Sequence, residues 1–243
     1  MDFAFLFATT RELLTGLPLT LQLSFYSLAF GAVLALIVAM MRMSNLALLT
    51  WPARSFVFIF RGTPLLVQIF LIYYGLGQFP AIRHSFLWPF LREPYWCAIL
   101  ALTLNTGAYG SEIIRGGLLA VPHGAIEAAR ACGMGRLLMF RRIIFPTAVR
   151  QALPAYSSEV ISMVKATSLA SIITMMEMTG IANKLISQTY RAIEVFICAG
   201  AIYLLINFLL TRAMLALEYW LSPHLRDAPR NATEQLDITL NQA

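Results

Sequence analysis

Long runs of apolar residues alternate with short polar segments along the chain, and these runs decide the fold class. Five runs cover roughly residues 13–41, 54–76, 95–114, 153–176 and 195–221. About 20 apolar residues suffice for a helix to cross the hydrocarbon core of a bilayer, which is about 30 Å thick. The pattern therefore predicts an all-α integral membrane protein with about five transmembrane helices.

The first run is predicted to be a retained helix rather than a cleaved secretory signal. A secretory signal has a basic start and an apolar region of about 7–15 residues. The first run is longer and follows Asp2, Arg11 and Glu12.

Composition agrees with a membrane location. Of the 243 residues, 59% are hydrophobic and 12% are charged, with a mean hydropathy of +0.71, whereas about a quarter of residues are charged in soluble domains. We expect one transmembrane domain over residues 1–222, followed by a polar cytoplasmic tail over residues 223–243. This length excludes a large catalytic domain.

The basic residues predict the orientation. Cytoplasmic loops of membrane proteins are enriched in Lys and Arg. Arg42 and Arg54 flank the first loop, and six arginines crowd the third loop: Arg115, Arg130, Arg136, Arg141, Arg142 and Arg150. These two loops are therefore predicted to be cytoplasmic, with the N-terminus outside and the C-terminus inside. The net charge of +6 is thus assigned to topology and not to nucleic-acid binding.

The third loop, about residues 118–150, is predicted to form a helix, a turn and a second helix. Residues 126–131 favour a helix, Gly133 and Gly135 interrupt it, and residues 136–144 resume it before Pro146. A short surface helix that ends at a glycine is suited to docking a cytoplasmic partner. An interfacial helix that rests on anionic lipid is the alternative.

The same loop carries a family resemblance. Glu127, Ala128, Ala129 and Gly133, followed at the proper spacing by Ile143 and Phe145-Pro146, resemble the EAA signature of the membrane subunits of ABC importers; only Phe145 departs from the usual leucine. The resemblance continues in three other segments: FRGTPLLVQ (60–68), LNTGAYGSEIIRGG (104–117) and LPAYSSEVISMVKATSLAS (153–171). Together they are similar to M-type permeases for histidine, lysine, arginine, ornithine or opines.

This resemblance implies a type I ABC-importer fold in a bacterial inner membrane. It also implies three kinds of partner: an ATP-binding subunit in two copies, a second, paralogous permease subunit, and a periplasmic substrate-binding protein. Glu127, Ala128, Ala129 and Gly133 would form the coupling helix that contacts the ATPase. ATP and Mg belong to that partner, because a P-loop requires Gly-Lys-Ser/Thr and neither Lys165 nor Lys184 follows a glycine. We therefore expect no cofactor on this chain and no enzymatic activity of its own.

Glu159 is the acid that most suggests a substrate site. An ionisable group within a membrane span is costly and indicates function, and Ser158 and Ser162 lie beside it and one turn on. A carboxylate suits an ammonium or guanidinium group; a structural ion pair is the alternative. The resemblance favours the substrate site. It also marks Ala166 as a departure, because the family often has a second acid there, so one subunit alone need not complete the pocket.

Other polar residues lie inside the third and second runs. Asn105, Tyr109 and Glu112 are spaced to share one helix face. The resemblance assigns Asn105 to substrate contact, and Glu112 is expected to be structural or to gate the path. Arg61 precedes Gly62-Thr63-Pro64, so a kink is expected there, with Arg61 extending to the inner surface. Glu177 is expected to be solvated or paired at the interface.

Competing functions are less consistent with the sequence. An ion-coupled secondary transporter is expected to have duplicated halves, and no internal repeat is evident. An intramembrane enzyme would need a motif such as HExxH or GxSxG, and neither occurs. His84, His123 and His224 are far apart, so no metal site is predicted.

Overall fold

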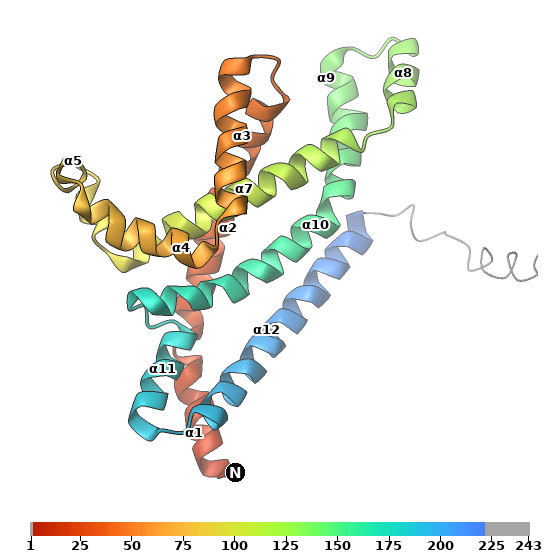
Figure 1. Ribbon diagram of the computed structural model, residues 1–243. Helices are drawn as coiled ribbons and strands as arrows, with labels where there is room; N and C mark the ends of the chain where they lie inside the picture. The colour runs from red at the N-terminus through yellow and green to blue at the C-terminus, as the bar shows by residue number, and fades with distance from the viewer. Residues whose placement is uncertain (1, 222–243) are drawn as a thin grey trace, which may run out of the picture.

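The computed structural model describes residues 2–221, and these form helices joined by short turns. Figure 1 shows an elongated arrangement in which α1 (Phe3–Leu14) packs against the start of α12 (Ala192–Leu221), while α8 (His123–Ala131) and α9 (Arg136–Met139) lie at the opposite end. The tail predicted for residues 223–243 lies outside the described residues.

The first predicted run, residues 13–41, lies within a longer helical stretch, Phe3–Met43. Asp2 caps α1 (Phe3–Leu14) by accepting the backbone amide of Ala4 at 3.1 Å, and α2 (Leu17–Met43) follows after two residues. A Cβ atom added at the intervening Gly16 would lie 2.8 Å from the backbone nitrogen of Met178. A glycine is therefore required where this junction touches a later helix.

The second predicted run is a broken helix. α3 (Ala47–Gly62) ends at Thr63-Pro64, and a second helical segment, Leu65–Gln78, leaves at 108° to it. That segment consists of α4 (Leu65–Phe70), the π turn η1 (Leu71–Gly75) and the 3₁₀ turn η2 (Leu76–Gln78). The predicted kink is confirmed, and the bend is sharper than that of a continuous kinked helix. The cause is Pro64, because proline has no amide hydrogen and disfavours helix in the preceding residue.

The third predicted run forms the central helix, α7 (Pro94–Leu119), after the short helices α5 (Pro80–Arg83) and α6 (Trp88–Leu91). α7 packs along α2 (Figure 1). A Cβ atom added at Gly107 would lie 2.6 Å from the side chain of Leu34, and one at Gly31 would lie 2.7 Å from Thr106. Small residues thus permit the close helix contact that is common within membranes.

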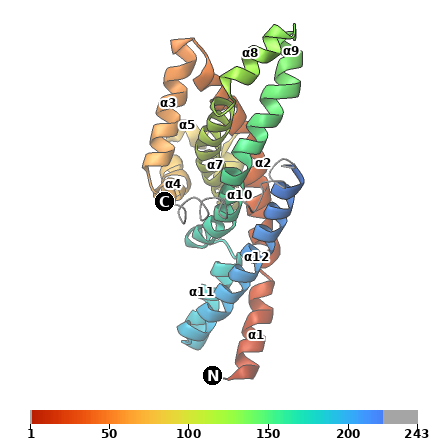
Figure 2. The ribbon, with the colours of Figure 1, turned by 90° about the vertical axis from the view of Figure 1, so that its right-hand side faces the viewer.

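The third loop folds as the predicted helix, turn and helix. α8 (His123–Ala131) leads to α9 (Arg136–Met139), the π turn η3 (Phe140–Ile144) and α10 (Phe145–Ala166). Figure 2 shows α8 and α9 together at the end farthest from the N-terminus. α10 begins earlier than the predicted fourth run.

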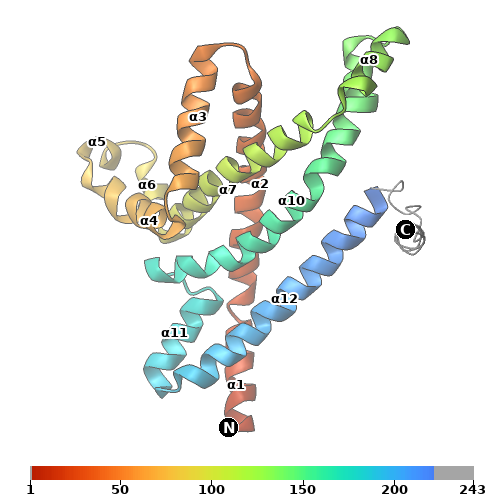
Figure 3. The same ribbon diagram turned by 45° about the vertical axis from the view of Figure 1, so that its right-hand side comes forward.

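The chain then returns toward α1. The 3₁₀ helix η4 (Thr167–Ile173) ends at Thr174, which has φ 65°, and is followed by α11 (Met178–Thr189) and α12 (Ala192–Leu221). Figure 3 shows α7, α10 and α12 as three inclined helices that rise toward the α8 end. Leu13, Met178 and Val195 form part of one buried cluster that joins α1, α11 and α12.

Glu177 corrects one expectation from the sequence, since its side chain is fully buried and is not at a solvated interface. Its carboxylate caps α11 by accepting a hydrogen bond from the backbone amide of Gly180 at 2.8 Å. It also accepts hydrogen bonds from the hydroxyls of Tyr203 at 3.1 Å and Thr20 at 3.4 Å. A buried carboxylate requires such donors. Glu177 therefore ties α2, α11 and α12 together.

Within residues 2–221, two helices are long and apolar enough to cross a membrane by themselves: Phe3–Met43, taken through the junction, and Ala192–Leu221. Two bent pairs qualify when taken together: Ala47–Gly62 with Leu65–Gln78, and Arg136–Ile173 with Met178–Thr189. α7 falls outside this set, because polar residues and glycines lower its hydropathy. It is packed against other helices and carries site residues.

Candidate functional site

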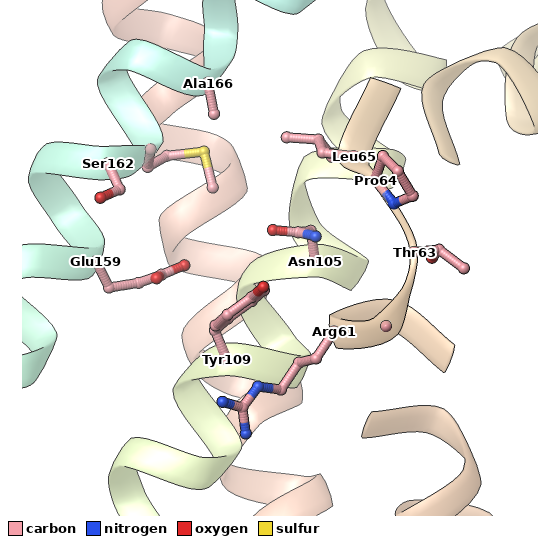
Figure 4. Close-up of a pocket in the computed structure, with 11 residues that line it drawn as sticks. Arg61, Thr63, Pro64, Leu65, Asn105, Tyr109, Glu159, Ser162 and Ala166 are labelled. Carbon is pink, nitrogen blue, oxygen red and sulfur yellow. The ribbon is translucent and has the colours of Figure 1, made fainter. Parts of the chain in front are cut away.

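A cavity of about 530 Å³ lies where the break between α3 and α4 faces α7 and α10. In Figure 4, the carboxylate of Glu159 and the amide of Asn105 point toward each other from opposite walls. Eleven residues line it: Arg61, Gly62, Thr63, Pro64, Leu65, Asn105, Tyr109, Glu159, Ser162, Met163 and Ala166. Three segments that are far apart in the sequence thus form one site.

Glu159 is the carboxylate in this lining. It is half-buried, and the hydroxyl of Thr106 donates to its Oε1 atom at 3.3 Å. Among residues 2–221 this hydroxyl is the one hydrogen-bond donor to Glu159, so the other carboxylate oxygen is available. A partly desolvated carboxylate that is not already ion-paired is suited to a ligand cation, because charge-assisted hydrogen bonds are the strong ones.

The broken end of α3 is held by Gln68, a residue whose role the sequence did not single out. Its buried amide nitrogen donates to the carbonyl oxygens of Phe60 at 2.8 Å and Thr63 at 3.1 Å, and to the Thr63 hydroxyl at 2.9 Å. Asn105 in turn donates to the Gln68 side-chain oxygen at 3.3 Å. Gln68 thus satisfies the carbonyls that the break frees, and it positions Asn105. The sequence carries one signal for this role: Gln68 is a polar residue in an otherwise apolar run, five residues after Thr63.

Replacing Gln68 with Leu is expected to destabilise the protein and disturb the cavity. The change removes the Gln68 donor from the carbonyl groups of Phe60 and Thr63, and hydrogen bonds within membranes contribute roughly 0.6–1.7 kcal/mol each. We expect the thermal unfolding midpoint of the purified protein in detergent to fall by several degrees. Gln78→Leu is the matched control, because Gln78 is exposed and its one side-chain hydrogen bond within the described residues goes to the Tyr74 carbonyl, at 3.4 Å. Equal midpoints for the two variants would contradict this role.

Arg61 lies at the edge of the cavity. Its guanidinium carbon lies 5.1 Å from the centre of the Tyr109 ring, and its Nη1 atom lies 4.0 Å from Glu112 Oε2. In Figure 4 the Arg61 side chain extends beneath Tyr109. The three residues connect the lining of the cavity to a charged region farther along α7.

Four of the five residues predicted to contact substrate line the cavity: Asn105, Tyr109, Glu159 and Ser162. Ser158 does not; its side chain is exposed and donates to the Pro154 carbonyl at 3.2 Å. Lys165 is also exposed and absent from the lining. The helical geometry of α10 directs successive residues to different faces, which separates Ser158 from its neighbour Glu159.

The predicted coupling residues lie on and just after α8. Glu127 and Ala128 are exposed, whereas Ala129 is 3% exposed and packs inside the chain. Gly133 has φ 73°, and the amides of Gly133 and Met134 donate to the carbonyls of Arg130 at 2.9 Å and Ala129 at 3.0 Å. This pair of bonds is a Schellman ending, which favours glycine at the left-handed position. Among the predicted coupling residues, Glu127, Ala128 and Gly133 are therefore exposed, whereas Ala129 is not.

Residues 27–223 match the family of binding-protein-dependent transport system inner membrane components. The chain belongs to this family. The permease is therefore the multi-pass inner-membrane component of an ABC transporter, which also comprises a binding protein and an ATPase, and it is not itself an enzyme. The alternative of an ion-coupled secondary transporter is wrong.

Named relatives of the permease cover nearly its whole length. It is 61% identical to the octopine transport system permease protein OccM of Rhizobium radiobacter, over 97% of this chain and 96% of the relative. It is 53% identical to the nopaline transport system permease protein NocM of Agrobacterium fabrum, over 93% and 94%. It is 44% identical to the histidine/lysine/arginine/ornithine transport system permease protein HisM of Escherichia coli, over 81% and 83%.

Solved structures confirm an ABC-importer permease fold. A chain from the crystal structure of an amino acid ABC transporter with histidines superposes with a TM-score of 0.80 at 34% identity, over 90% of this chain and 98% of that one. A chain of the inward-facing MetNI methionine ABC transporter superposes with a TM-score of 0.70 at 21% identity, over 87% and 96%. The second likeness concerns the fold alone.

Proposed function

We propose that the permease is an M-type subunit that moves cationic amino acids or opines from a periplasmic binding protein to the cytoplasm. The observation that carries the proposal is the placement of Glu159, a half-buried carboxylate without an ion-pair partner in residues 2–221, in the cavity at the α3–α4 break. The named relatives carry octopine, nopaline or basic amino acids. A guanidinium group, which the arginine-derived substrates share, fits a carboxylate in a two-pronged manner.

The other lining residues suit the polar remainder of such a molecule. Asn105, Tyr109 and Ser162 present an amide and two hydroxyls to the cavity. Pockets of this type combine apolar walls with a few placed polar groups that fix orientation. Ala166 supplies no second acid, so the partner permease subunit can differ from this one in how tightly it binds. We therefore propose a pair of paralogous subunits and not a homodimer.

The proposed arrangement in the membrane has about five crossings, with the N-terminus outside and the C-terminus inside. The transmembrane domain would comprise residues 1–222 and the cytoplasmic tail residues 223–243. α8, which lies at the end opposite the N-terminus, would then face the cytoplasm. ATP and Mg would be bound by two copies of the ATPase subunit, with no cofactor on this chain.

The connection between α8 and the cavity suggests how ATP hydrolysis changes access. α7 carries Asn105 and Tyr109 and ends at Leu119, four residues before α8 begins at His123; α10 carries Glu159 and follows directly after η3. A displacement of α8 therefore acts on two walls of the cavity at once. Motion of two packed helices about a binding site is a common form of alternating access.

The test is reconstitution with the expected partners. Co-expression with the ATPase, the paralogous permease and the binding protein should yield one complex. ATP hydrolysis by that complex should rise several-fold when binding protein loaded with octopine or arginine is added. Binding protein loaded with neither ligand is the control. A complex that assembles and hydrolyses ATP, but does not respond to any cationic amino acid or opine, would contradict the proposed substrate class.

A further inference from the structure

A second cavity of about 470 Å³ adjoins the Glu159 cavity on the side of the α2–α3 loop. The two cavities share three lining residues: Arg61, Gly62 and Tyr109. The remainder of the second lining comes from α2, α3 and α7: Arg42, Arg54, Val57, Phe58 and Glu112. The two cavities therefore lie next to each other along α7, with Arg61 and Tyr109 between them.

The second cavity carries an excess of positive charge. Its lining contains three arginines and one glutamate, Glu112. Glu112 forms salt bridges with Arg42, with Arg61 at 4.0 Å, and with Arg115 at 2.9 Å. One carboxylate therefore meets three guanidinium groups. Charges of one sign that are partly removed from water are costly unless a counter-charge accompanies them.

Two of the arginines have hydrogen-bonding capacity left over. The Nε atom of Arg42 is buried and has no hydrogen-bond partner within residues 2–221, although the Arg42 side chain is 17% exposed. Arg54 is exposed and takes part in none of the salt bridges found in residues 2–221. Guanidinium groups bind carboxylate or phosphate oxygens with paired N–H donors. The unused donors are thus of the type that an oxyanion requires.

We propose that this second cavity binds a carboxylate of the transported molecule on its way to the cytoplasm, with Arg54 and Arg42 as its donors. The inference rests on the proposed function, because it takes the Glu159 cavity as the site that binds the cationic end of the transported molecule. Glu159 would hold the guanidinium or ammonium end of the molecule, and the arginine-lined cavity would receive its acidic end. Glu112 would compete with that carboxylate for the same guanidinium groups and so allow release.

The shared wall favours the transported carboxylate over a lipid phosphate as the anion. A lipid headgroup would reach the cavity from the bilayer surface and would have no relation to the Glu159 cavity, whereas the lining residues Arg61, Gly62 and Tyr109 belong to both. Anionic lipid is the competing occupant, since basic pockets between membrane helices at the cytoplasmic side also attract lipid headgroups.

The test uses two probes that differ in one charge, L-arginine and L-argininamide. Their affinities are measured on the complete transporter in phosphatidylcholine nanodiscs, at a slightly acidic pH that keeps both amino groups protonated. Arg54→Gln should reduce the preference for arginine over the amide by roughly tenfold, as expected for loss of a charge-assisted pair. Glu112→Gln should increase that preference, because a competing carboxylate is removed. Arg92→Gln, between α6 and α7 and outside both cavity linings, should leave it unchanged.

The outcomes separate this inference from the proposed function. Glu159→Gln should weaken both probes alike, because both retain the guanidinium group; failure there contradicts the proposed function. An unchanged preference in Arg54→Gln, with Glu159→Gln behaving as expected, overturns the carboxylate site alone. An effect of Arg54→Gln that occurs only when phosphatidylglycerol is added to the nanodiscs would assign the cavity to lipid and overturn it as well. A decreased preference in Glu112→Gln would also overturn it.

Discussion

A transporter with the Gly133→Val substitution is expected to lose most of its substrate-stimulated ATP hydrolysis. Gly133 has φ 73°, a left-handed conformation that costs an L-residue roughly 1–2 kcal/mol and is least accessible to β-branched residues. The Schellman bonds from Gly133 and Met134 that end α8 would weaken, so α8 would be presented to the ATPase in its proper orientation roughly tenfold less often. The measurement is ATP hydrolysis by the reconstituted complex, with and without loaded binding protein.

Gly133→Asn is the matched control for this prediction. Asn adds a side chain of similar size, but tolerates the left-handed conformation far better than valine. Apart from Gly133 and its two chain neighbours, no heavy atom of the described residues lies within 4 Å of a Cβ atom added at Gly133, so neither variant is excluded by lack of space. Asn should retain most of the stimulation, and both variants should insert into the membrane in similar amounts. Normal stimulation in the Val variant would contradict a role for the end of α8 in coupling.

The helical segments could be predicted from the sequence because burial in lipid needs only apolar residues in long runs. The runs near residues 13–41 and 195–221 correspond to α2 and α12, whose boundaries differ from the prediction by a few residues. The second run could not be predicted in detail. Composition does not reveal that the chain turns by 108° at Thr63-Pro64, because apolar residues continue on both sides of the break. A continuous helix and two helical segments bury similar surfaces.

Contacts between distant segments account for the expectations that failed. Glu177 was expected at an interface, and it is buried because Thr20 and Tyr203 donate to it from helices far away in the sequence. Similarly, Gln68 acts on the carbonyl of Phe60 only because the chain is broken between them. Single-helix periodicity describes which residues share one face, but not which other helix meets that face.

The candidate site was predictable where chemistry alone was informative. An acid within an apolar run marked Glu159, and helical spacing associated Asn105 with Tyr109; all three line one cavity. Ser158 was placed beside Glu159 by sequence proximity and lies outside the lining. Arg61 could not be assigned a role, because its neighbours Tyr109 and Glu112 come from α7. The glutamate is thus the residue on which the substrate assignment depends.

Glu159→Gln is expected to reduce the uptake of arginine or octopine by roughly 10- to 100-fold at substrate concentrations below KM. Glutamine retains the shape and the acceptor for the Thr106 hydroxyl, but it removes the negative charge that faces the guanidinium group. Hydrogen bonds to charged groups contribute about 1.5–3 kcal/mol, and every 1.4 kcal/mol corresponds to a factor of ten. The measurement is initial uptake into proteoliposomes that contain the complete transporter, ATP and the loaded binding protein.

Glu12→Gln is the matched control, because Glu12 is an exposed carboxylate on α1, far from the cavity lining. It should transport as the unmodified permease does. The Glu159→Gln complex should assemble normally, as judged by size-exclusion chromatography, since Glu159 accepts one hydrogen bond from a hydroxyl and takes part in no ion pair within residues 2–221. If the variant assembles and transports arginine normally, the carboxylate does not bind the substrate. If it fails to assemble, the Glu159–Thr106 contact between α10 and α7 is structural, and the substrate assignment loses its main support.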